Sequence, residues 1–100
     1  MNKSGSKKVI ITHPESQREM KIDTAIYEPF KAAIIQSLTG SKGKTFTELT
    51  DDVVKIIRKK MPAFKGSLPW YTISIRHDLE TRGVVETVIE KRKKLSRLKK

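Results

Sequence analysis

Apolar positions recur through the middle of this chain at spacings of three and four residues, which is typical of amphipathic helices. The pattern predicts three helices. Their apolar faces run over residues 26–38, 49–61 and 68–79. Residues that helices tolerate poorly follow each face and mark its end: Gly40, Pro62 and Gly83.

Polar residues that suit helix N-termini precede the three apolar faces. The predicted caps are Asp23 or Thr24, Thr47, and Ser67. Pro29 conflicts with a first helix that starts at Asp23, because proline is tolerated only in the first turn. We therefore expect this helix to begin near Ile26 or to have an irregular first turn.

Near both ends of the chain, apolar and polar residues alternate with a period of two, which is typical of strands. Residues 9–12 and 18–22 flank a segment that contains proline, and they predict an N-terminal β-hairpin. Residues 84–90 predict a further strand, followed by a charged turn at 91–94. Residues 95–98 either return as a partner strand or are unstructured, and the sequence leaves both open.

Thr45 and Phe46 are predicted as a short extended piece before the second helix. The predicted order of helix, short strand, helix, helix and terminal hairpin is that of a winged helix. Three segments make the likeness more specific, namely residues 22–28, 66–71 and 75–85. With the N-terminal hairpin at 9–22, residues 9–90 resemble a small bacterial family of winged-helix proteins. The resemblance implies an α+β winged helix-turn-helix domain with three helices, a C-terminal wing hairpin and the extra N-terminal hairpin. It implies no particular chemistry.

Charge divides the chain into three parts. The 100 residues hold 22 Lys and Arg against 11 Asp and Glu, a formal net charge of +11. Residues 1–8 carry only basic charges and predict a flexible tail, and residues 91–100 form a basic wing and C-terminal tail. Residues 9–90 are close to neutral. The high charge therefore describes the two ends rather than the body of the domain.

A basic extension beside a folded module can follow DNA phosphates without reading bases. We therefore expect a non-enzymatic protein that binds duplex DNA with low sequence specificity, as transcription regulators and nucleoid-associated proteins do. Three residues of the third helix are the candidates for contacts near the bases: Ser67, Thr72 and Arg76. The candidates for phosphate contacts are Lys91, Arg92, Lys93, Lys94, Arg97, Lys99 and Lys100.

The outward face of the third helix carries few side chains that read bases. Trp70, Ile73 and His77 lie on it, with Glu80 close by. One interpretation is that these side chains pack against the N-terminal hairpin or the wing. The alternative function is a protein–protein interaction module, in which this face binds a partner or a second copy of the chain.

Other classes of function find no support in the sequence. The chain lacks cysteine and has two histidines, so we expect no metal site, no cofactor and no catalytic residues. Asp78 and Arg82, four residues apart, predict a surface ion pair rather than a catalytic group. Neither a signal peptide nor a membrane span is indicated, which predicts a cytoplasmic protein that does not act on a membrane. We expect no small-molecule substrate.

Overall fold

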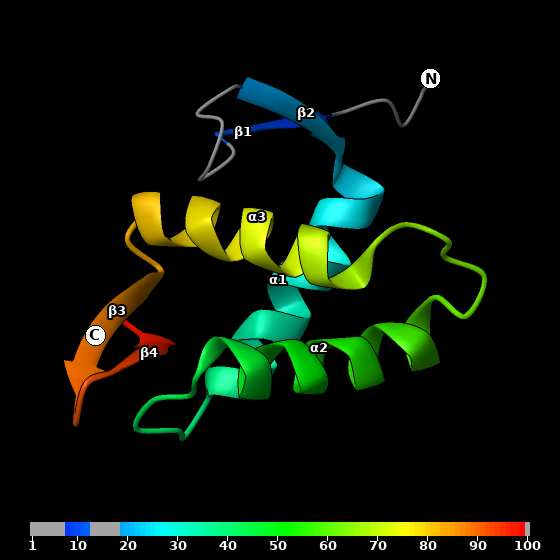
Figure 1. Cartoon of the computed structure of the whole chain (residues 1–100). Coiled ribbons are helices and arrows are strands. Elements are labelled where there is room, and N and C mark those ends of the chain that lie inside the picture. The colour runs from blue at the N-terminus through cyan, green and yellow to red at the C-terminus, as the bar shows by residue number, and fades with distance from the viewer. Residues whose placement is uncertain (1–7, 13–18, 100) are drawn as a thin grey trace.

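The described part of the protein is an α+β domain with three helices and two small antiparallel hairpins (Figure 1). This computed structural model describes residues 8–12 and 19–99. Lys8, predicted as the last residue of the basic tail, belongs to a strand. The other tail residues, 1–7, the segment 13–18 between the first two strands, and Lys100 lie outside the described residues. In chain order the elements are β1 (Lys8–Thr12), β2 (Glu19–Asp23), α1 (Thr24–Leu38), α2 (Phe46–Lys60), α3 (Leu68–Thr81), β3 (Val85–Glu90) and β4 (Lys93–Leu98).

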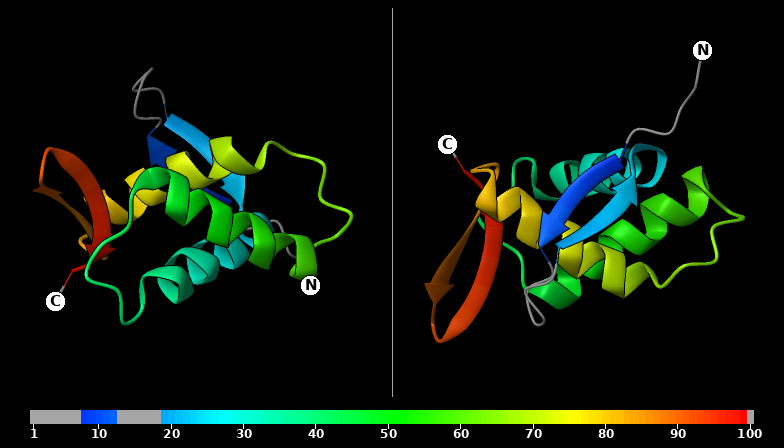
Figure 2. Two further views of the ribbon diagram at one scale, coloured as in Figure 1. Left: turned by 60° about the horizontal axis from the view of Figure 1, so that its bottom comes forward. Right: turned by 90° about the horizontal axis from the view of Figure 1, so that it is seen from above.

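The N-terminal hairpin pairs β1 with β2 in antiparallel register, as the alternation predicts. Val9 pairs with Ile22, and Ile11 with Met20. Ile11 and Ile22 are buried, whereas Lys21 on the opposite face of β2 is exposed. Seen from above, the hairpin lies across α3 and α1 (Figure 2), so its apolar face completes the core. A lone hairpin would be marginal in water, and this packing stabilises it.

Helix α1 begins at Thr24, so the prediction of a start near Ile26 is wrong. Pro29 is inside the helix and beyond its first turn. Proline has no N–H, and the carbonyl of Ala25 therefore lacks its helical donor. Ala25 is exposed, so water can replace that donor. Tyr27 and Phe30, on either side of the proline, are buried and hold the helix in place through packing.

The caps of α2 and α3 follow from their sequences. Thr45, rather than the predicted Thr47, caps α2, and it forms a capping box with Glu48. The Thr45 hydroxyl accepts from the Glu48 N–H, and the Glu48 carboxylate accepts from the Thr45 N–H. Ser67 caps α3 as predicted, by accepting from the N–H of Trp70 at 3.3 Å. Gly83, with a φ of +80°, ends α3 in a conformation that favours glycine.

The core forms where the three helices and both hairpins meet. Helix α3 lies between the N-terminal hairpin and α2 (Figure 1). The largest fully buried side chains of the helices are Phe30, Ile34, Leu38, Leu49, Val53, Ile57, Ile75 and Leu79. The predicted apolar faces of all three helices supply these residues. Phe64 of the α2–α3 connector packs edge-on against Phe30 and Tyr71, with ring centroids 5.6 and 5.4 Å apart.

The C-terminal hairpin pairs β3 with β4 from Val85↔Leu98 to Glu90↔Lys93. Residues 95–98, left open by the sequence, therefore form the last part of a strand. The predicted turn at 91–94 is shorter, because Lys93 and Lys94 already belong to β4. Ser96 also forms an antiparallel bridge with Lys44 of the α1–α2 connector. The basic segment is thus mostly a strand that belongs to the fold, and Glu90 does not mark the end of the structured chain.

Candidate nucleic-acid interface

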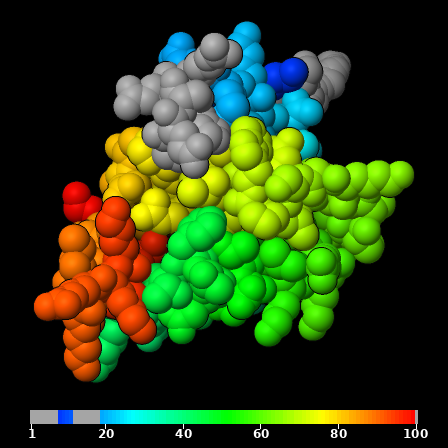
Figure 3. Space-filling view, in the orientation of Figure 1, coloured from blue at the N-terminus to red at the C-terminus, as the bar shows by residue number. Residues whose placement is uncertain are grey.

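The tip of the C-terminal hairpin is a run of four cations. Lys91 and Arg92 form the two-residue turn, and Lys93 and Lys94 begin β4. All four residues are exposed, and within the described part of the chain none of their side chains makes a hydrogen bond or an ion pair. Figure 3 shows the hairpin, in orange and red, protruding at one end of the molecule. The tip therefore offers four positive charges to a partner from outside.

The turn at this tip is strained. The φ angles of Lys91 and Arg92 are 49° and 67°, both in the left-handed region. Two positive φ angles are typical of the type I′ turn, which hairpins favour because its twist matches that of the strands. Asn-Gly is the preferred sequence of this turn because both residues tolerate a positive φ. The left-handed conformation costs a non-glycine residue roughly 1–2 kcal/mol. Backbone strain of this kind is common at functional sites, which makes Lys91 and Arg92 candidate functional residues.

The base of the same hairpin is held at Ser96, which is 3% exposed. The Lys44 N–H donates to the Ser96 carbonyl at 2.9 Å, and the Ser96 N–H donates to the Lys44 carbonyl at 2.7 Å. The Ser96 hydroxyl accepts from Arg76 Nε at 2.8 Å. The strand is therefore fixed to both the α1–α2 connector and α3.

The Arg76 side chain bonds to other residues of the protein, although its residue type predicted a contact near the bases. Besides Ser96, its Nη2 donates to Thr87 Oγ1 at 2.6 Å, and its Nη1 lies 3.6 Å from Glu80 Oε1. Thr87 in turn donates to Glu80 Oε2 at 2.7 Å. The Arg76 side chain is only 15% exposed. We therefore assign Arg76 to holding the hairpin against α3, and not to contacts with DNA.

The structure also removes Thr72 from the candidates. Its side chain is 0% exposed, and its hydroxyl donates to the Leu68 carbonyl at 2.7 Å within α3. Thr72 is not one of the apolar residues of this helix, and it is buried because α3 packs against α1, α2 and both hairpins. Ser67 is exposed at the start of α3 and bonded to Trp70, so its hydroxyl already serves the cap.

The remaining basic candidates differ in whether their charge is already paired within the protein. Arg97 Nε donates to the Glu86 carboxylate across the hairpin, so much of its charge is neutralised within the protein. Lys99 is exposed just after β4, and Lys100 lies outside the described residues. The cations of the segment that are available to a partner are therefore those of the tip and Lys99.

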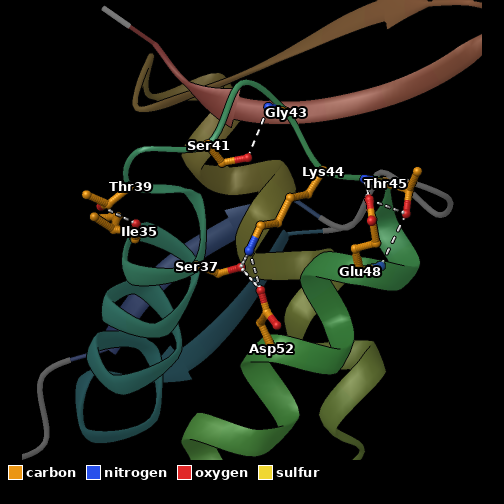
Figure 4. A network of polar contacts seen from close by, with 9 residues as sticks. All are labelled: Ile35, Ser37, Thr39, Ser41, Gly43, Lys44, Thr45, Glu48 and Asp52. Atoms are coloured by element: carbon orange, nitrogen blue, oxygen red, sulfur yellow. Dashed lines mark hydrogen bonds and ion pairs between the residues drawn. The ribbon is translucent and has the colours of Figure 1, made fainter.

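The α1–α2 connector that holds β4 is itself fixed by a polar network (Figure 4). The Lys44 ammonium pairs with the Asp52 carboxylate, which also accepts from Ser37 Oγ at 2.7 Å. These hydrogen bonds from Lys44 and Ser37 lower the pKa of Asp52. Gly43 leaves room for Leu95 of β4, because a Cβ there would lie 3.0 Å from the Leu95 Cβ. This junction was not predicted from the sequence, since the residues that meet at the connector come from α1, α2 and β4.

The outward face of α3 is poor in positive charge. Trp70, Ile73 and His77 are half-buried, and Glu80 faces the same side. Trp70 packs edge-on against Tyr71, with ring centroids 4.9 Å apart. His77 Nδ1 lies 4.0 Å from Glu80 Oε1. This face would meet phosphates with a carboxylate and apolar surface.

Asp78 corrects the prediction of a surface ion pair with Arg82. The two side chains do pair, with Arg82 Nε 2.7 Å from Asp78 Oδ2, but Asp78 is 4% exposed. The hydroxyl of Tyr27 in α1 donates to the same carboxylate oxygen. Burial and this carboxylate raise the pKa of Tyr27 well above its usual range. The signal was present in the sequence, because Asp78 stands three residues after Ile75 and seven after Tyr71, on the apolar side.

Within residues 8–12 and 19–99, no three His, Asp or Glu side chains gather where they could hold a metal ion. Over the same residues, every helix is too short or too polar to cross a membrane. The C-terminal hairpin with its exposed cations is accordingly the feature with the clearest chemistry.

The fold defines a small α+β domain, and its sequence places it in a family. The family model described as "Family of unknown function (DUF6958)" matches residues 8–95, which is most of the chain. The protein belongs to this family. No match was found among curated proteins or solved structures.

Proposed function

We propose that this protein is a non-enzymatic DNA-binding protein of the winged-helix type, with the C-terminal hairpin as its wing. The observation that carries the proposal is the run of four exposed, unpaired cations, Lys91 to Lys94, on a hairpin fixed to the helices. A rigid cationic hairpin can follow a phosphate backbone, and each neutralised phosphate releases counterions.

The arrangement of elements supports the winged-helix type. The segment between α1 and α2 bridges to β4 through Lys44 and Ser96, so a third short stretch joins the two strands of the wing. Helix α3 leads directly into β3 through Gly83, which places the hairpin beside its C-terminal end (Figure 1). A duplex that contacts the wing would pass close to α3.

The proposed mode of binding has low sequence specificity. Base edges are read mainly by Arg, Lys, Asn and Gln. The outward face of α3 has Trp70, Ile73, His77 and Glu80, and its Arg76 is bonded to the hairpin. Affinity then comes chiefly from phosphates, and we propose a role like that of a transcription regulator with few base contacts or of a nucleoid-associated protein.

Salt dependence of binding tests the proposal directly. The tip cations and Lys99 would neutralise roughly 4–5 phosphates, so we expect a log–log slope of about −3.5 to −4.5. The measurement is fluorescence anisotropy of a labelled random-sequence duplex with the full chain at several salt concentrations. Absence of binding at low ionic strength would refute the proposal, and a shallow slope would exclude the tip as the main contact.

Replacing the strained turn by K91N/R92G separates function from stability. Asn-Gly relieves the left-handed strain, so the free energy of unfolding should rise by about 1–2 kcal/mol. Loss of two cations should weaken DNA binding by at least about 10-fold at 0.1 M salt. Urea denaturation and anisotropy measure the two effects. If the affinity is unchanged or rises, Lys91 and Arg92 are not kept for phosphate contacts.

A protein interaction module is the second candidate, and the uncharged part of the α3 face favours it. Trp70, Ile73 and His77 form a half-buried, largely apolar group without a cation of its own. Interface cores are depleted in charge and enriched in aromatic residues. Sedimentation velocity of the full chain, without DNA, tests the version in which a second copy binds. Self-association that W70A removes would favour this candidate.

A further inference from the structure

Ile89 is a large apolar side chain that the fold leaves in solvent. It is 69% exposed, whereas the other large exposed hydrophobic residues of the described chain, Ile10 and Phe46, are 54% and 37% exposed. Single exposed apolar residues are common on protein surfaces. The position of Ile89 on the hairpin is what distinguishes it.

Ile89 stands among the cations of the tip. It pairs directly with Lys94 across the hairpin and is followed, after Glu90, by the turn of Lys91 and Arg92. Glu90 is the register partner of Lys93, and the run from Glu90 to Lys94 carries a net charge of +3. A partner that meets the tip therefore meets positive charge around one β-branched apolar side chain.

The hairpin presents Ile89 from a fixed base. Side chains alternate along a strand, so Ile89 is on the same face of β3 as Thr87, two residues before it. Thr87 and its partner Ser96 are both bonded to Arg76 of α3. The Thr87–Ser96 pair, which is anchored to α3, thus lies next to the exposed Ile89–Lys94 pair on this face. This anchor pre-organises the tip for binding.

We propose that Ile89 is an apolar wedge that enters the minor groove of a bound duplex and partly unstacks one base step. This inference rests on the proposed DNA-binding function and adds a preference to it. Apolar wedges kink DNA, and pyrimidine–purine steps such as TA unstack at the lowest cost. The chain would then favour duplexes with deformable steps without reading any base through hydrogen bonds.

A lipid surface would also attract cations beside an apolar side chain, but the hairpin fits it poorly. Membrane binding grows with the apolar area that is buried in the interface. The residues that follow Ile89, from Glu90 to Lys94, are all charged. One isoleucine offers little such area, whereas one side chain is enough to wedge a base step.

The test compares the full chain with I89T and with the control I10T, using two duplexes of equal composition. One duplex has central TA steps, the other has none, and both carry donor and acceptor dyes at their ends. Threonine is β-branched and keeps the strand propensity at both sites. We expect the unchanged chain to prefer the TA duplex by about 5-fold and to raise its energy transfer through bending. I89T should lose both effects and keep the salt slope, and I10T should keep all three.

The outcomes separate this inference from the proposed function. If I89T retains the preference and the bending, the wedge is wrong while DNA binding stands. If the unchanged chain binds neither duplex, the proposed function fails and the wedge with it. The last measurement is binding of the unchanged chain and of I89T to vesicles of an anionic phospholipid. Vesicle binding that I89T removes, with DNA affinity and bending unchanged, would overturn the wedge in favour of a lipid contact.

Discussion

Replacing Lys91, Arg92, Lys93 and Lys94 together by glutamine should lower the affinity for a random-sequence duplex by at least about 100-fold at 0.1 M salt. The log–log salt slope should flatten by about 3.5, because four phosphate contacts are lost. None of the four side chains bonds to another described residue, so the hairpin should stay folded. Anisotropy over a range of salt measures both quantities, and circular dichroism checks the fold.

The matched control is K55Q/R58Q/K59Q/K60Q, which removes the same charge from the exposed cations of α2. If the hairpin tip is the contact, this variant should lose only a few-fold in affinity. Equal losses from the two variants would mean that net charge, rather than the tip, governs binding. A truncation after Glu90 is less informative, because it deletes β4 together with Ser96 and its bonds to Lys44 and Arg76.

The core was predictable from the sequence because it depends on local periodicity. The spacing of Tyr27, Phe30 and Ile34 sets the inner face of α1 whatever packs against it, and all three are buried. Helix starts were less predictable. Thr45 and Thr47 both suit a cap, and the Glu48 that decides between them acts through a side-chain bond back to Thr45.

The candidate interface was predictable only in part, because residue type indicates what a side chain can bond and not what it meets. Arg76 has the chemistry to read guanine, yet Ser96 and Thr87 engage its guanidinium from β4 and β3. Those partners are 20 and 11 residues away in the chain. No local pattern brings them together, and whether residues 95–98 form a strand was itself open.

Charge also concealed structure at the C-terminus. The density of lysine and arginine after Glu90 indicated a basic tail. The same segment also has the alternation of a strand. Ser96 is buried, and Leu98 on the same face packs against the core. Arg97 between them is on the opposite face and bonds to Glu86, and Lys93 and Lys94 lie further along, at the exposed tip. A single segment can therefore be both a structural strand and a cationic surface.

Asp78 is a buried polar position where a substitution should disturb the fold strongly. It is 4% exposed and joins α3 to α1 through Tyr27. It also holds Arg82, whose Nη2 reaches the Ile10 carbonyl of β1 at 3.4 Å. One carboxylate therefore ties the N-terminal hairpin to two helices. A buried polar group that loses its partner costs about 1–3 kcal/mol.

We expect D78A to lower the free energy of unfolding by about 2–3 kcal/mol, because the Tyr27 hydroxyl is left buried without an acceptor. In a domain of this size that is a fall in Tm of roughly 10–20 °C. D78N should cost less, since an amide oxygen can still accept from Tyr27. Thermal and urea denaturation measure the difference. Equal losses in the two variants would show that the negative charge, and not the hydrogen bond to Tyr27, stabilises the fold.

The pH dependence of stability isolates Tyr27 from the rest of this junction. Its pKa is raised in the folded protein, mainly by burial and then by the bond to Asp78, so the folded state keeps a proton that the unfolded state loses above about pH 10. Stability should therefore fall as the pH rises above 10, by up to about 1.4 kcal/mol per pH unit from this group. Y27F removes the titrating hydroxyl, and its stability should fall less steeply over the same range. Urea denaturation of both proteins from pH 9 to 11 gives the free energy of unfolding at each pH. If this free energy falls equally steeply with pH in the two proteins, the result contradicts the buried hydrogen bond.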